Sequence, residues 1–114
     1  MATKLISIAV GGVNDTVTAG NKLVIRSRNI SGDSQLSLSV FPAAGATARV
    51  YFTHSPLETI VADPDDVAIN WLKWPNGDIT NASSDDLKED TLVRAVKAVK
   101  VEATGGSVIV QGSI

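Results

Sequence analysis

The sequence predicts an all-β protein: a small antiparallel β-sandwich, or jelly-roll-like domain, of about eight short strands. Apolar and polar residues alternate, as in Leu36, Leu38 and Val40 and again along 48–52. A period of two places alternate side chains on opposite faces of a strand. Clusters of Gly, Pro, Asn, Asp and Ser separate these runs at short intervals, as turns do.

The first half of the chain is a series of predicted strands. They span 3–10, 16–18, 23–27, 35–41 and 46–54. Within the third, Leu23 and Ile25 are expected on one face, and Val24 and Arg26 on the other. Gly11-Gly12, Ala19-Gly20, Ser31-Gly32-Asp33 and Pro42–Gly45 supply the intervening turns.

The middle of the chain is richer in loop signals. Leu57–Asp66 contains Pro64 and several aspartates, so we expect a surface loop there. Ile69–Trp74 is a predicted strand, and Pro75–Asp78 a predicted turn, because proline fixes φ and Gly or Asn tolerates positive φ. Pairing is expected to resume at Ile79-Thr80. The polar stretch Asn81–Asp90 is expected to be an exposed excursion.

The last third allows two local structures. Ser83 with Asp86 resembles a capping box, and Leu92, Val96 and Val99 have helical spacing, so a short helical turn near 85–92 is allowed. Val99, Val101 and Ala103 alternate instead, and alternation returns after the Gly105-Gly106 turn. We therefore expect a final β-hairpin over Lys97–Gln111.

Length and composition limit the classes of function. The 114 residues predict a single domain, 1–114. The absence of cysteine excludes disulfides and thiolate metal sites and favours a protein made in the cytoplasm. The net charge of −2 offers no basic stripe for nucleic acid, and no apolar run approaches the length of a membrane span. The apolar run after Lys4 is too short for a signal peptide.

The residues that commonly carry catalysis or bind metals are few and scattered. His54, the only histidine, neighbours Ser55, but adjacent strand residues point to opposite faces, which argues against a catalytic pair. The aspartates of 63–66 lack the glycine and glutamate of an EF-hand loop, and the acidic run 85–90 is typical of a solvated face. The sequence thus predicts no enzyme, no catalytic residue, no metal and no cofactor.

Trp71 and Trp74 are the only tryptophans of the chain. Residues three apart in a regular strand lie on opposite faces. We therefore expect one of them in the core and the other near the surface, where tryptophan often anchors an interface.

Three stretches between Ala46 and the C-terminus resemble known proteins. They are 50–56, a strand ending in Ser-Pro; 71–77, with Trp-x-x-Trp and a Pro-x-Gly turn; and 98–106, Ala-Val-Lys-Val-x-Ala-Thr-Gly-Gly, followed by Val108-Ile109-Val110. In this order they resemble small structural proteins encoded in the head gene clusters of tailed bacteriophages. The resemblance covers about half of the chain.

The resemblance implies a virion protein, most like a head decoration, or cement, protein. Such a protein is made in the host cytoplasm, binds the major capsid protein on the outer capsid surface, and bridges neighbouring subunits as a homo-oligomer, a dimer or trimer. Binding only to the assembled lattice stabilises that state by mass action. Two alternatives remain open: a neck, tail or fibre-associated adaptor, and a glycan or host-surface binding module. No contact with nucleic acid or membrane is expected.

The residues expected at the partner interface come from three segments. The first strand is expected to pair with the edge of a neighbouring sheet, the loop 57–66 exposes apolar side chains, and one of the tryptophans anchors the contact. The interface residues are Lys4, Leu5, Ile6, Ile8, Ile60, Val61, Trp71 and Trp74.

Overall fold

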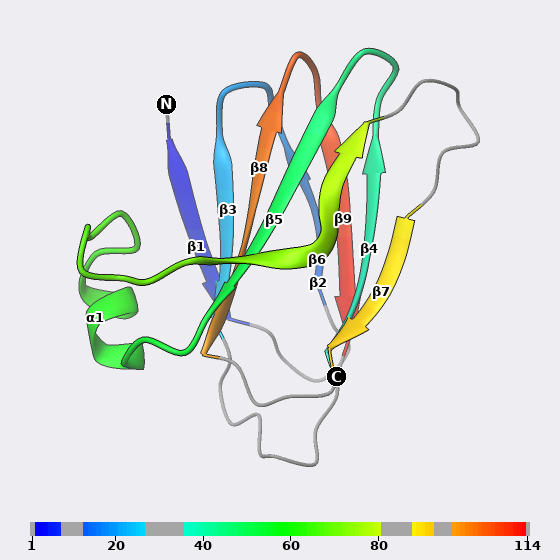
Figure 1. Ribbon diagram of the computed structural model, residues 1–114. Coiled ribbons are helices and arrows are strands. Elements are labelled where there is room, and N and C mark those ends of the chain that lie inside the picture. Colours follow the sequence, from blue (N-terminus) through cyan, green and yellow to red (C-terminus); the bar gives the residue numbers. More distant parts are fainter. Residues whose placement is uncertain (1, 8–12, 27–35, 81–87, 93–96, 114) are drawn as a thin grey trace.

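The computed structural model describes residues 2–7, 13–26, 36–80, 88–92 and 97–113. In these residues two β-sheets pack face to face, which confirms the predicted all-β sandwich (Figure 1). The five-stranded sheet has the order β1-β3-β8-β5-β6, and the four-stranded sheet the order β2-β9-β4-β7. The elements are β1 (Thr3–Ser7), β2 (Val13–Val17), β3 (Lys22–Arg26), β4 (Leu36–Pro42), β5 (Thr47–Thr53), α1 (Leu57–Ala62), β6 (Leu72–Thr80), β7 (Lys88–Leu92), β8 (Ala98–Thr104) and β9 (Val108–Ser113).

The strands from β2 to β9 form a jelly roll. They pair as one long folded hairpin: β2 with β9, β3 with β8, β4 with β7 and β5 with β6, all antiparallel. The hairpin is rolled so that successive pairs fall alternately in the two sheets, which is the jelly-roll arrangement. Strand β1 is additional to these eight strands, and it pairs with β3 in parallel.

The main core lies between the two sheets, as the alternation predicts. In β3, Leu23 and Ile25 point into this core, while Val24 points to the opposite side of the sheet. Aromatic residues are scarce, so valine and alanine fill most of the space. The core residues are Val17, Leu23, Ile25, Val40, Ala46, Ala48, Val50, Phe52, Trp74, Val99, Val101, Ala103, Val108 and Val110.

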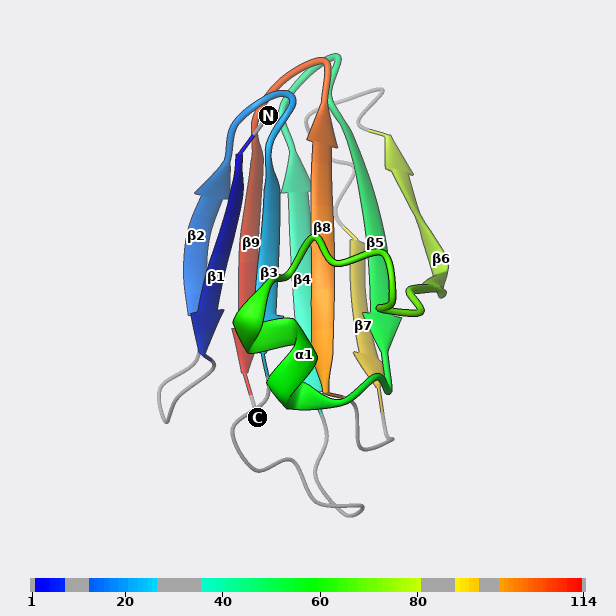
Figure 2. The ribbon, with the colours of Figure 1, turned by 90° about the vertical axis from the view of Figure 1, so that its left-hand side faces the viewer.

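A second, smaller cluster lies on the outer face of the five-stranded sheet. The connection between β5 and β6, which contains α1, crosses this face (Figure 2). Ile60 of α1 packs there with Val24 and Ala98. The expectation of a surface loop over Leu57–Asp66 is therefore wrong for 57–62, because burying Ile60 against the sheet stabilises a short amphipathic helix.

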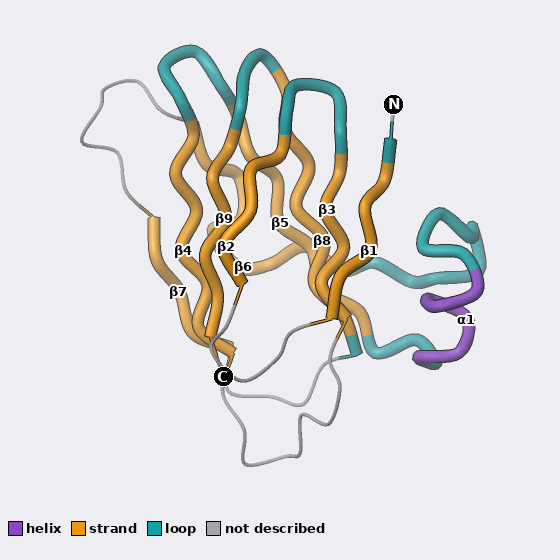
Figure 3. Tube along the Cα trace, turned by 180° about the vertical axis from the view of Figure 1, so that it is seen from behind, coloured by secondary structure: helices purple, strands orange, loops and turns teal. Residues whose placement is uncertain are grey.

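Three short turns connect the two sheets at one end of the roll (Figure 3). Each contains a glycine with positive φ: Gly20, Gly45 and Gly105. Because β8 and β9 lie in different sheets and never pair, the predicted hairpin over Lys97–Gln111 is wrong. Alternation followed by a Gly-Gly turn cannot distinguish a hairpin from a crossing between sheets.

The predicted turn at Pro75–Asp78 is also wrong, because β6 continues through it. Lys73 pairs with Tyr51 and Asp78 with Arg49, so the residues 74–77 bulge opposite Val50. Strand β6 is the edge of its sheet, where a proline is tolerated because its missing N–H is not needed for pairing.

The helical turn allowed near 85–92 is wrong for 88–92, which form a strand. Residues 88–92 form β7, which pairs with β4, so 88–90 are not part of an irregular excursion. Pairing with β4 overrides the weak local helix signals of this segment. The rest of the predicted excursion and of the predicted helical turn, residues 81–87, lies outside the described residues. Residues 8–10 of the first predicted strand lie outside them as well.

Candidate functional site

Strand β1 forms one edge of the five-stranded sheet and has no second partner strand among the described residues. The Lys22 N–H donates to the Ala2 carbonyl, 2.9 Å away. Backbone groups alternate in direction along a strand, so those of Thr3, Leu5 and Ser7 point to the open edge. Such an edge presents unpaired donors and acceptors to another chain.

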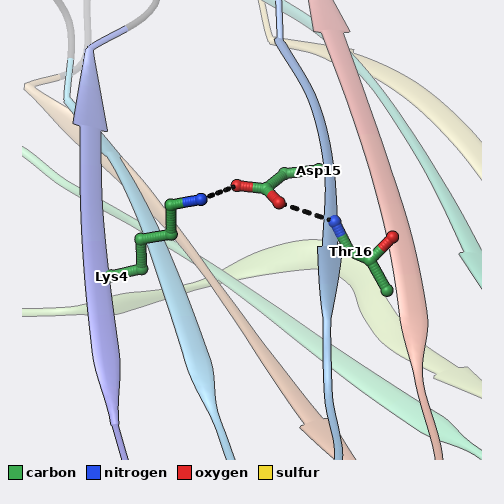
Figure 4. Close-up of polar contacts among 3 residues, drawn as sticks. All are labelled: Lys4, Asp15 and Thr16. Carbon is green, nitrogen blue, oxygen red and sulfur yellow. Dashed lines mark hydrogen bonds and ion pairs between the residues drawn. The ribbon is translucent and has the colours of Figure 1, made fainter.

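An ion pair ties β1 to the other sheet (Figure 4). Lys4 Nζ lies 2.8 Å from Asp15 Oδ2 on β2, and Asp15 Oδ1 accepts a hydrogen bond from the Thr16 N–H. The hydrogen bond from Lys4 lowers the pKa of Asp15, partial burial opposes this, and the Thr16 N–H adds to the lowering. These contacts hold the edges of the two sheets side by side.

The two faces of β1 contribute to both hydrophobic clusters. Half-buried Leu5 packs against the outer cluster and half-buried Ile6 against the main core. Thr3 Oγ1 donates to Asp65 Oδ1 at 2.8 Å, which links β1 to the β5–β6 connection. The strand is thus fixed on both sides while its backbone edge remains open.

A pocket of about 350 Å³ lies on the outer face of this sheet. The β5–β6 connection forms one wall, and β1, β3 and β8 contribute the rest. Its lining is Thr3, Lys22, Pro64, Asp65, Asp66, Val67, Ile69, Trp71 and Lys100.

Lys100 is the most tightly surrounded charged group of this pocket. Its ammonium lies 4.9 Å from the centre of the Tyr51 ring and 4.6 Å from that of Trp71, within the range of cation–π attraction. Glu102 Oε1 lies 3.6 Å from Lys100 Nζ and 3.8 Å from Lys22 Nζ. Burial lowers the pKa of Lys100, whereas the charge of Glu102 opposes that shift.

The structure separates the residues predicted for the interface into exposed and buried sets. Lys4 is exposed and Val61 is 46% exposed, while Leu5 and Ile6 are half-buried. Ile60 was expected to be exposed, and this is wrong: it is fully buried where α1 packs against the sheet. Ile8 lies outside the described residues.

The two tryptophans occupy different environments. Trp74 is 3% exposed in the main core, where its ring meets the Phe52 ring edge-on. Trp71 is half-buried beside the outer cluster and the pocket. The structure therefore brings Trp71 and Leu5 to the same side of the sheet, whereas Trp74 faces the interior.

The pocket residue Lys100 and its neighbours Glu102 and Tyr51 were not predicted from the sequence. Lys100 and Glu102 alternate with buried Val99 and Val101, which marks them as outward-facing, and Tyr51 is the cross-strand partner of Lys100. The pairing of strands distant in sequence brings these side chains together. Alternation identifies the face of each residue but not its neighbours.

The groups considered for chemistry have structural contacts. The exposed His54 meets Phe52 edge-on, and Ser55 Oγ accepts a hydrogen bond from the Asn70 N–H. Among the described residues, no group of three or more His, Cys, Asp or Glu side chains is arranged to hold a metal ion. In the same part of the chain, no helix is long and apolar enough to cross a membrane.

Two of the solved structures that resemble this chain cover nearly all of it. No protein-family description and no curated protein matches the chain. The pre-peptidase C-terminal domain of a collagenase from Bacillus anthracis is 9% identical, with a TM-score of 0.44, over 97% of this chain and 94% of that one. PliG of Aeromonas hydrophila, a periplasmic inhibitor of g-type lysozyme, is 12% identical, with a TM-score of 0.38, over 97% and 99%.

Proposed function

We propose that this protein decorates the outer surface of an assembled phage capsid, where it binds the major capsid protein and bridges neighbouring subunits. The observation that carries the proposal is β1, an edge strand added to an already complete jelly roll. The sequence resemblance to phage head proteins supports the choice of partner. The jelly roll itself is a fold that recurs in viral capsid proteins.

The open edge of β1 provides the means of attachment. A strand of the capsid subunit adds to it through main-chain hydrogen bonds at Thr3, Leu5 and Ser7. Binding only to the assembled lattice then stabilises the capsid by mass action.

The test blocks the edge without removing the strand. Ser7→Pro removes an N–H that points away from β3, so β1 retains its pairing, and Ser7→Ala is the matched control. We expect Ser7→Pro to bind purified capsids at least about tenfold more weakly in a co-sedimentation assay, and Ser7→Ala to bind normally. Deletion of residues 2–8 is expected to abolish binding.

Circular dichroism and thermal melting check that each variant keeps its fold. Equal binding by folded Ser7→Pro and by the unaltered protein contradicts attachment through this edge. Failure of the unaltered protein to bind any capsid contradicts the proposed function as a whole.

A further inference from the structure

We propose that the pocket beside Trp71 is a binding site for a saccharide. This inference concerns a site separate from the open edge of β1 and goes beyond capsid attachment. The pocket lies between the β5–β6 connection and strands β1, β3 and β8. Its volume, about 350 Å³, lies at the lower end of the range for small-molecule sites.

The pocket supplies hydrogen-bond donors from two lysines. Lys22 Nζ and Lys100 Nζ share the Glu102 carboxylate at 3.8 Å and 3.6 Å. Both distances exceed the roughly 2.7–2.9 Å of a charge-assisted hydrogen bond. Each ammonium therefore has capacity to donate to hydroxyl or ring oxygens of a ligand.

Two carboxylates on the opposite wall supply acceptors. Asp65 Oδ1 accepts from Thr3 Oγ1, and Asp66 Oδ1 accepts from the Ala68 N–H. These contacts fix both side chains and involve one oxygen of each carboxylate. Two lysines and two aspartates line the pocket, and the Glu102 carboxylate lies beside both lysines, so the local formal charge is −1, which disfavours an anionic ligand.

The apolar part of the wall comes from the same segment. Trp71 is half-buried, Ile69 is buried and Val67 is 99% exposed at the rim. The ammonium of Lys100, 4.6 Å from the centre of the Trp71 ring, holds the indole in place at the pocket. A sugar ring combines a C–H surface that packs on such a wall with hydroxyls that both donate and accept, so it matches all three parts of the lining.

The two tryptophans provide a signal from the pocket and a reference signal from the core. Trp71 lines the pocket and Trp74 lies in the core, so their two indole N–H signals report the site and the interior separately. We would titrate the isotope-labelled full chain with methyl α-D-glucoside, methyl β-D-galactoside and N-acetyl-D-glucosamine, followed by two-dimensional amide NMR. Sodium acetate and sodium phosphate serve as anion controls.

At least one of the three sugars is expected to shift the Trp71 indole and the amides of 64–71 saturably at millimolar concentration, without moving the Trp74 indole. Lys22→Gln and Trp71→Ala are expected to weaken this binding about tenfold. Leu72→Ala, a half-exposed neighbour outside the pocket, is expected to bind normally. Lys22→Gln keeps the test valid if Trp71→Ala fails to fold.

Absence of saturable shifts with all three sugars overturns the inference. It is also overturned if acetate or phosphate shifts the pocket while the sugars do not, because the site is then an anion site. Capsid binding is measured separately with Ser7→Pro, so failure of one proposal is distinguishable from failure of the other.

Discussion

Lys4 on β1 and Asp15 on β2 form an ion pair, 2.8 Å from Nζ to Oδ2, that joins the edges of the two sheets (Figure 4). The two strands do not pair through their backbones. Side chains therefore fix the additional strand against the jelly roll at this seam. Thr3, which donates to Asp65, performs the same task on the outer face.

Asp15→Asn is expected to loosen β1 and lower stability slightly. Lys4 is 65% exposed, so the pair contributes at most about 1 kcal/mol and less at high salt. Because the folded-state pKa of Asp15 lies below its ordinary value of 3.8, the contribution is fully present above that value. It disappears as the pH falls through the lowered pKa.

Urea unfolding at neutral and strongly acidic pH, together with hydrogen exchange of the β1 amides, tests this expectation. The difference between the unaltered protein and Asp15→Asn must shrink in acid. A difference that stays constant with pH contradicts the assigned role of the ion pair.

Gly105→Ala is expected to destabilise the protein more than Gly20→Ala. Both glycines have positive φ, 74° and 82°, so both substitutions carry a backbone cost of about 1–2 kcal/mol. A Cβ at Gly105 would also lie 2.7 Å from the Gly45 carbonyl oxygen, whereas one at Gly20 meets nothing within 4 Å. Chemical denaturation gives the free energy of unfolding of both variants, and the difference between them measures the cost of the clash. Equal losses of unfolding free energy would show that the turns do not pack closely.

Ile60→Ala is expected to release the β5–β6 connection from the sheet. Ile60 is fully buried, and truncating such a side chain commonly costs about 2–5 kcal/mol. The adjacent Val61 is 46% exposed, so Val61→Ala is the matched control with little effect. Proteolysis within 54–71 should accelerate only in Ile60→Ala, and equal protection of both variants contradicts the docking of α1.

Lys100→Met is expected to change the pH dependence of stability in the alkaline range. Burial lowers the folded-state pKa of Lys100 from 10.5, so between that lowered value and 10.5 the unfolded chain binds the proton more strongly. Stability contributed by this group therefore rises with pH across that window. The free energy of unfolding, measured as a function of pH, should therefore change differently across this window in the unaltered protein and in Lys100→Met. Parallel pH profiles would contradict the assigned burial effect.

Alternation predicted strand faces well because burial between two sheets imposes it directly. Leu23 and Ile25 face the core and Val24 the outer cluster, as the period of two requires. The same signal failed at the β8–β9 connection, because it carries no information about which sheet a strand joins. Pairing between distant strands decides that.

The candidate sites were only partly predictable for a similar reason. The apolar run after Lys4 predicted a strand that contains Lys4 and Leu5, and the strand order of the sheet places it at the edge. Ile60 was misplaced because a six-residue helix is too short to give a clear period. The contact of Trp71 with Lys100 joins segments far apart in sequence, so no local pattern indicates it.

The number of copies per virion tests the proposed function most directly. Quantitative mass spectrometry of purified virions of the encoding phage, scaled to the major capsid protein, gives that number. Decoration of the lattice predicts hundreds of copies, in a fixed ratio to the capsid subunits. About a dozen copies or fewer would contradict it and place the protein at the neck or tail. Absence from the particle would contradict any virion role.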